Sequence, residues 1–259
     1  MLRTRRSRLI ASSLTAITLG LTVAGYQAGA AVTSSSDSTA QSASHTTKAA
    51  QLAKAAKAGG TCLTDATTLV GDLDGDGNMD LISNPGHNGT KMTIQWGAKD
   101  GSFGKKVAVK DLLGAKKGEV ATAAVADFQN DGTLDMVVNI VEPAGGDDPN
   151  NARLAEYRPG PVNRTDLASD NARHSDVGDM GEAKQLRIAD FNKDEYPDLA
   201  ILNNGGDGQL DRDVRLSTKD SGPGDFTYED FEKYGEAGAL SDPPSMPTNG
   251  WKSFYKPCA

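Results

Sequence analysis

The chain has 259 residues, of which 37% are hydrophobic and 5% aromatic, with 29 glycines and a formal net charge of −8. A net negative charge argues against electrostatic binding to nucleic acid or to an anionic membrane. Few aromatic residues and many glycines favour one medium-sized domain that contains many turns.

Residues 1–30 have the pattern of a signal peptide. Arginines at positions 3, 5, 6 and 8 precede a mostly apolar or small stretch over residues 9–26, and Ala28-Gly29-Ala30 fits a cleavage site. Cleavage there removes four positive charges and no negative ones, which changes the net charge from −8 to −12. We therefore expect a secreted, extracellular protein without stable membrane insertion. A retained membrane anchor is the alternative, and polar residues within the apolar run argue against it.

Residues 31–60 are rich in Ser, Thr and Ala and contain no aromatic residue. Such a segment buries too little apolar surface to offset its chain entropy, so we expect a flexible spacer. Within it, residues 48–59 have high helix propensity and predict a short helix. The globular domain is then expected over residues 61–259.

The only two cysteines of the chain, Cys62 and Cys258, bracket almost the whole globular part. In an exported protein, two such cysteines are expected to form one disulfide, with two free thiols as the alternative. The disulfide predicts that the two ends of the domain meet.

The stretch from Asp72 to Asp80, DLDGDGNMD, predicts a calcium site. Its acidic residues occupy odd positions, so a tightly turned loop can direct all four carboxylates at one point, where they repel each other unless a cation binds. Gly77 permits the sharp turn, and the carbonyl of Asn78 can supply a further ligand. The four carboxylates belong to Asp72, Asp74, Asp76 and Asp80.

The motif occurs two more times. It returns as DFQNDGTLD at Asp127 to Asp135 and as DFNKDEYPD at Asp190 to Asp198, with starts 55 and then 63 residues apart. Each copy follows a short apolar segment and leads into another, which predicts a loop between two strands. Three copies in one context indicate a repeat architecture.

These loops, together with the glycine and aromatic segment WGAKDGSFG at Trp96 to Gly104, resemble the FG-GAP or VCBS repeat. That repeat is the blade unit of calcium-binding β-propellers such as the integrin head. The resemblance covers nearly all of residues 62–235 and implies an all-β, β-propeller-like repeat fold with three recognisable blades. A small closed ring, an open stack of three blades and a ring completed by several chains all stay open. We favour a compact arrangement of three to four blades whose ends are tied by the disulfide.

The resemblance also implies calcium ligands at equivalent positions of the three loops. In the first loop they are Asp72, Asp74, Asp76, the Asn78 carbonyl and Asp80. In the second they are Asp127, Gln129, Asp131, the Thr133 carbonyl and Asp135. In the third they are Asp190, Asn192, Asp194, the Tyr196 carbonyl and Asp198. Glu195 stands where glycine allows a positive φ in the other loops and should strain its turn, so we expect the first loop to bind calcium most tightly.

Residues 142–182 depart from the blade pattern. We expect mainly surface loop there, with edge strands near Ala152 to Tyr157 and Ala172 to Val177. Long loops on a rigid scaffold often carry binding, and an ordinary solvated insertion is the alternative. The side chains that could contact a ligand are Arg153, Tyr157, Arg158 and His174. Near the C-terminus, Trp251, Phe254 and Tyr255 are expected to pack beside Cys258 rather than to stack on a sugar.

The sequence favours a binding module over an enzyme. His174-Ser175-Asp176 is not expected to be a catalytic triad, because neighbouring residues of an extended segment point to opposite faces. We expect a secreted calcium-binding repeat protein that acts in adhesion or binds an extracellular glycan or protein. The alternative is an extracellular lyase or hydrolase that acts on polysaccharide and holds calcium for stability.

Overall fold

A computed structural model describes residues 50–54, 56, 60–142, 150–177 and 181–259. The chain divides into two units, Met1–Ser38 and Thr39–Ala259, and every described residue belongs to the second. The expected signal peptide and most of the spacer lie outside the described residues. Within the spacer, residues 50–54 and 56 are helical, as their composition predicts. None of the helices in the described part of the chain is long and apolar enough to cross a membrane.

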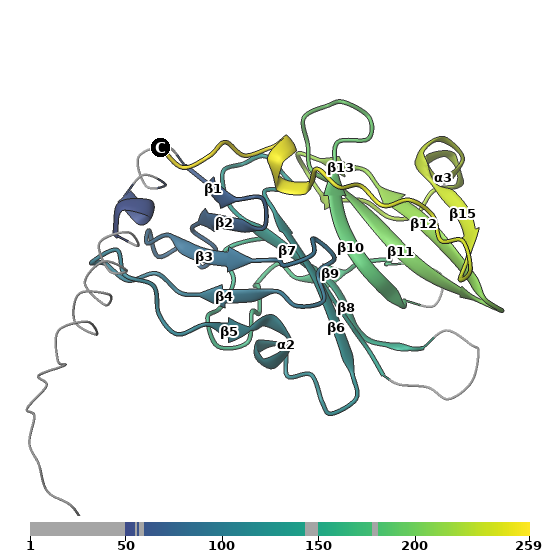
Figure 1. The fold of residues 1–259 in the computed structure, drawn as a ribbon, viewed down its shortest axis with the longest axis horizontal. Helices are drawn as coiled ribbons and strands as arrows, with labels where there is room; N and C mark the ends of the chain where they lie inside the picture. The colour runs from purple at the N-terminus through teal and green to yellow at the C-terminus, as the bar shows by residue number, and fades with distance from the viewer. Residues whose placement is uncertain (1–49, 55, 57–59, 143–149, 178–180) are drawn as a thin grey trace, which may run out of the picture. The chain divides into compact units, whose positions relative to one another are not determined.

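The domain is all-β and contains three antiparallel sheets in succession, which we call the first, second and third blade (Figure 1). The first blade has the order β1(Cys62–Asp65), β2(Thr68–Gly71), β3(Asp80–Ser83), β4(Thr93–Gln95), β5(Val107–Ala108), followed by the helix α2(Val109–Leu112). The second contains β6(Val120–Ala126), β7(Asp135–Val141), β8(Ala152–Arg158) and β9(Arg173–His174). The third contains β10(Ala183–Ala189), β11(Asp198–Gly206), β12(Gln209–Arg215) and β15(Glu236–Ala239).

Each acidic motif connects the two strands predicted around it. The first, second and third loops join β2 to β3, β6 to β7 and β10 to β11, and all three strand pairs are antiparallel. The three blades predicted from the repeats are therefore confirmed. Between β12 and β15 lie the ribbon of β13(Ser217–Thr218) with β14(Gly222–Pro223) and the helix α3(Tyr228–Tyr234).

The core runs through all three blades. Every residue of β7 is buried, and so are the last six of the seven residues of β6, in agreement with their continuous runs of small and β-branched residues. The inner strands β6 and β10 lie side by side, and Thr122 of β6 hydrogen-bonds the Ala183 carbonyl of β10. The loop after β3 joins them, because the Ala123 N–H bonds the Gly89 carbonyl and the Leu186 N–H bonds the Asn88 carbonyl.

The segment over residues 142–182 contains the two strands expected there, β8 and β9, and of these only β9 lies at the edge of its sheet. The strand β8 is not an edge strand, because it pairs with β7 on one side and with β9 on the other. Tyr157 and Arg158 are only 1% and 8% exposed, so the suggestion that they could contact a ligand is wrong. Tyr157 packs edge-on against Phe128, and the Arg158 guanidinium donates to the Leu167 carbonyl. Interior packing therefore accounts for both side chains.

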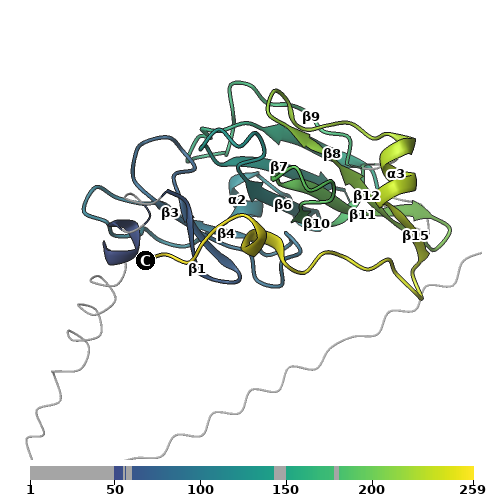
Figure 2. The ribbon, with the colours of Figure 1, turned by 90° about the horizontal axis from the view of Figure 1, so that it is seen from above.

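The two ends of the domain meet, as the cysteines predict. Cys62 and Cys258 form a disulfide with 5.0 Å between their Cα atoms. Leu63 donates its N–H to the Lys256 carbonyl and accepts from the Cys258 N–H, so the C-terminal segment extends the first blade beside β1 (Figure 2). In the described part of the tail, β15 completes the third blade, and the described residues form no fourth blade. The fold has three blades over the described residues.

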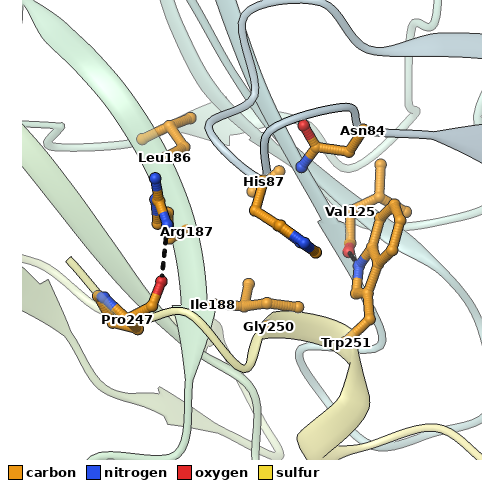
Figure 3. A pocket seen from close by; sticks show the side chains of 10 residues that line it. Asn84, His87, Val125, Leu186, Arg187, Ile188, Pro247, Gly250 and Trp251 are labelled. Carbon is orange, nitrogen blue, oxygen red and sulfur yellow. Dashed lines mark hydrogen bonds between the residues drawn. The ribbon is translucent and has the colours of Figure 1, made fainter. Parts of the chain in front are cut away.

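Before its end, the C-terminal segment packs against the inner strands. The short helix η1(Gly250–Ser253) carries Trp251, which is 3% exposed and donates its indole N–H to the Val125 carbonyl at 2.6 Å. The core packing expected of this tryptophan is confirmed, although its partners are the inner strands and not Cys258. A hollow of about 20 Å³ remains between η1, β6 and β10, and His87 points into it between Ile188 and Trp251 (Figure 3). That volume holds about one water molecule.

His87 predicts an acid-sensitive contribution to stability. Burial, followed by the charges of Arg187 and Lys252, holds the pKa of His87 below its usual value. As the pH falls through about 6.5, the unfolded chain takes up a proton that folded His87 refuses, so the folded state loses stability until the folded pKa is also passed. We expect a His87→Asn variant to lose less stability than the wild type between about pH 7.5 and about pH 5.

Asparagine is the matched substitution because His87 has φ of 57° and asparagine tolerates that left-handed conformation. Urea unfolding of both proteins at each pH gives the difference between their free energies of unfolding. The contributions of all other titrating groups are the same in both proteins and cancel in this difference. Parallel curves for the two proteins would contradict the prediction.

Candidate metal centre

The three acidic loops share one pattern of backbone hydrogen bonds. In each loop the first Asp accepts the N–H of the residue five positions later, with distances of 2.8, 2.8 and 3.3 Å at Gly77, Gly132 and Glu195. The fifth residue, also Asp, accepts the N–H of the seventh, at 2.8, 2.8 and 3.0 Å for Asn78, Thr133 and Tyr196. These bonds satisfy the donors of a tight turn and hold the carboxylates on its inner side.

The turn also requires left-handed backbone at its fourth and sixth positions. The first loop has glycine at both, Gly75 and Gly77, and the second has Asn130 and Gly132. The third has Lys193 at φ 65° and Glu195 at φ 70°, which confirms the conformation expected at Glu195. Because a non-glycine residue pays about 1–2 kcal/mol for this conformation, the third loop is the most strained of the three.

The last Asp of each loop is almost fully buried and ties the loop to the rest of its blade. Asp80, Asp135 and Asp198 are each at most 1% exposed. Each accepts one N–H from the second position of its own loop and one from a residue 17, 25 or 19 positions later. Burial raises the pKa of these carboxyls to about 7, 6 and 7, against the lowering effect of the backbone donors. A nearby cation favours their ionised form.

The residues that donate the second N–H to these buried carboxylates were not predicted from the sequence. They are Gly97, Gly160 and Ser217, and each lies two residues after β4, β8 or β12. A Cβ on Gly97 would lie 2.2 Å from the Met79 carbonyl oxygen, and one on Gly160 would lie 2.3 Å from the Leu134 oxygen. Ser217 instead donates its hydroxyl to the Pro197 carbonyl at 2.6 Å. Their constant position, two residues after the end of a strand, is the sequence signal that could have identified them.

The first loop brings three of its four carboxylates together. Asp72, Asp74 and Asp80 each offer an oxygen, and these oxygens lie within 4.8 Å of one another. Calcium binds oxygen ligands at about 2.3–2.6 Å, so ligands on opposite sides of one ion lie up to about 5 Å apart. One calcium ion can therefore reach all three oxygens. The donor set, carboxylates only, also fits a hard cation.

Asp76 stands apart from this group. Its carboxylate accepts from the Asn78 side-chain amide at 2.9 Å and from the guanidinium of Arg164, a residue of the second blade. Arg164 also binds Asp74. The first loop thus has a cationic side chain among its predicted ligands.

The second and third loops differ from the first in their third residue. Gln129 points away from its loop, since its amide donates to the Lys219 carbonyl at 3.1 Å and accepts from the Tyr157 hydroxyl at 3.3 Å. Asn192 stays in its loop and bonds the carboxylate of Asp194 at 2.8 Å. Among the described residues, only the first loop forms a group of three acidic side chains with oxygens this close.

The remaining predicted ligands keep equivalent positions in the last two loops. The first Asp of each, Asp127 or Asp190, is half-buried, and the fifth, Asp131 or Asp194, is exposed. Burial raises the pKa of Asp127, while the N–H groups of the loop lower it. Both loops therefore retain the turn and the carboxylates but lack the side-chain convergence of the first.

The residues His174, Ser175 and Asp176 do not assemble a catalytic site. His174 is exposed whereas Ser175 is 2% exposed, so the two side chains face different environments. Asp176 lies 3.7 Å from the buried guanidinium of Arg215. This arrangement agrees with the expectation that neighbouring residues of an extended segment do not form a triad.

Comparison with known proteins identifies one family feature. The family model of the FG-GAP-like repeat matches residues 71–138. The match includes the first and second loops and ends within β7, so the resemblance drawn from the acidic motifs is confirmed over this stretch. No curated protein matches the chain.

Proposed function

We propose that this chain, which carries an FG-GAP-like repeat at residues 71–138, is a secreted calcium-binding repeat protein that serves as a binding or adhesion module. The observation that carries the proposal is the convergence of Asp72, Asp74 and Asp80 within 4.8 Å of one another. The same turn, with hydrogen bonds at the same two positions, occurs in the second and third loops. The partner we propose is an extracellular glycan or protein.

The chain's own residues would hold the ion and use it to rigidify the blades. Calcium, when bound, supplies the positive charge that offsets the repulsion among the carboxylates. Asp80 has the central part, because its carboxylate also accepts the N–H groups of Leu73 and Gly97 at 3.0 and 2.7 Å. An ion held by Asp80 would therefore fix the first loop and the chain just after β4 together. Metal binding then adds directly to the stability of the fold.

A binding role agrees with what surrounds the loops. The loops are solvent-accessible turns at strand ends, where a rigid scaffold presents side chains to a partner. The titratable groups with raised pKa near them are the buried Asp residues already tied to backbone donors. They are therefore engaged in holding the loop rather than placed for proton transfer to a substrate.

Calcium titration by calorimetry, followed by thermal melting with and without chelator, tests the proposal. We expect binding at about 0.1–1 mM calcium and a rise in Tm that chelator abolishes. The first loop has the most carboxylates and has glycine at both left-handed positions of its turn. Asp76→Ala should therefore remove more of this rise than Asp131→Ala in the second loop or Asp194→Ala in the third. Asp111→Ala, which removes an exposed carboxylate outside the loops, should leave the rise intact.

Two results would count against the proposal. One is a wild-type protein that shows neither heat of binding nor a change in Tm at about 5 mM calcium. The other is an equal response of all four variants, because an effect of general surface charge does not depend on the loops.

A further inference from the structure

The guanidinium of Arg164 occupies the outer side of the first loop. Its Nε bonds Asp74, its Nη2 bonds Asp76, and the same Nη2 donates to the Gly97 carbonyl at 3.3 Å. The guanidinium also lies 5.6 Å from the centre of the Trp96 ring, in cation–π range. The Asp74 side chain is only 5% exposed, so this pairing is partly shielded from water.

Arg164 lies on a segment of the second blade whose backbone is anchored against the first loop. Within residues 161–168, Val162 is 3% exposed and donates its N–H to the Leu73 carbonyl of the first loop at 3.0 Å. Pro161 lies so close to Gly75 that a Cβ there would meet it at 2.8 Å. Leu167 is fully buried and closes the turn by donating to the Asn163 carbonyl. The backbone that carries Arg164 is therefore anchored beside the first loop.

The other loops receive no comparable cation in the described structure. The segment that follows β12 reaches the second loop, but it offers the neutral Lys219 carbonyl, which accepts from Gln129. The ion pairs between a basic side chain and a loop carboxylate both involve Arg164 and the first loop. The guanidinium thus distinguishes the loop that has the most carboxylates.

We propose that Arg164 is an internal counter-cation that competes with calcium for Asp74 and Asp76. This inference rests on the proposed calcium binding. With Arg164 in place, Asp76 is held outside the group formed by Asp72, Asp74 and Asp80. Binding of calcium to the full set requires the oxygens of Asp74 and Asp76 to exchange the guanidinium for the ion, because two cations at adjacent positions repel.

The exchange has consequences outside the first loop, in both the first and the second blade. Arg164 also contacts the Gly97 carbonyl and the Trp96 ring, so its departure changes the environment of that ring. By linkage, whatever holds Arg164 on the loop weakens calcium binding, and calcium weakens the hold on Arg164 by the same factor. Arg164 therefore couples the first loop to residues 161–168 of the next blade.

Calcium affinity of Arg164→Gln, measured by calorimetry, tests the competition. We expect this variant to bind calcium at the first loop about tenfold more tightly than the wild type, given two ion pairs of which the one with Asp74 is partly shielded from water. Arg164→Lys keeps the charge but loses the two-pronged geometry and should show a smaller gain. Arg153→Gln is the matched control, since it removes the same charge from an arginine of the same blade that pairs with Glu119 instead.

Fluorescence supplies a second readout, because the chain has two tryptophans and one of them, Trp96, lies beside Arg164. Calcium should change the emission of the wild type, and metal-free Arg164→Gln should already show most of that change. Trp96→Phe should lose the response, which assigns it to this ring and not to Trp251.

The outcomes separate the two ideas. If neither the wild type nor Arg164→Gln binds calcium, the proposed calcium function fails. If the wild type binds calcium and Arg164→Gln binds it equally or more weakly, calcium binding stands and the competition is overturned. In that case Arg164 supports the loop instead of opposing the ion.

Discussion

Simultaneous replacement of Cys62 and Cys258 by alanine is expected to lower the free energy of unfolding by about 3–5 kcal/mol, because the bond closes a very long loop of chain. The two residues are 196 positions apart. Without the bond the unfolded chain gains the entropy of that loop, while in the folded state the C-terminal segment keeps its hydrogen bonds to Leu63 and the packing of Trp251. Urea unfolding of the oxidised wild type and of the double variant measures the difference.

A reducing agent provides the internal control. It should destabilise the wild type to about the level of the double variant and leave the double variant unchanged. A double variant as stable as the oxidised wild type would contradict the prediction, since packing of the tail would then suffice to hold the ends together.

Gly97→Ala is expected to cost about 3 kcal/mol of stability, because a methyl group has no room beside the first loop. A Cβ at this position would lie 2.2 Å from the Met79 carbonyl oxygen, which is backbone and has little freedom to move. The shift needed to relieve the contact would also disturb the bond from the Gly97 N–H to Asp80. Thermal and urea unfolding measure the loss, and we expect weaker calcium binding at the first loop as well.

Gly205→Ala is the matched control for this substitution. Gly205 lies in β11, and the nearest atom to its added Cβ would be in the flexible side chain of Gln209 at 3.4 Å. The control should be nearly neutral. Similar losses in both variants would show that the cost comes from the glycine backbone in general and not from the contact with Met79.

The parts of the fold that could be predicted depend on residues close together in the chain. The spacing of aspartate and glycine within nine residues specifies the turn, and apolar segments on each side specify the strands, so the three loops and three blades follow from the sequence. The positive φ of Glu195 follows from the same alignment of loops. The disulfide follows from the count of cysteines together with the expected compartment.

The parts that could not be predicted depend on long-range contacts. Asp80 and its equivalents were expected only as ligands, but their buried carboxylates also hold backbone donors from 17 to 25 residues away. Arg164 lies 88 residues from Asp76, and no local pattern connects the two. The number of carboxylates predicts that the first loop binds calcium most tightly. That prediction does not include the guanidinium of Arg164, which comes from another blade.

The strand β8 was expected at the edge of a sheet, and its interior position was not predicted for a related reason. Proline and glycine surround it, which suggests surface loop, while its own residues alternate only weakly between buried and exposed positions. Its identity as an interior strand depends on its pairing with β7 and β9. The flanking residues describe the turns at its ends and not the strand itself.

The closure between Cys62 and Cys258 also determines how the domain carries a mechanical load. A pull applied at Gly60 and at Ala259 passes through the covalent bond between these cysteines, which is far shorter than the path through the blades. The strands between the two cysteines then bear no tension, and their hydrogen bonds need not resist it. Under such a pull the repeat domain acts as a bead of constant length on the chain. Tension reaches the sheets only when it is applied between the N-terminal side and a partner bound at the blades.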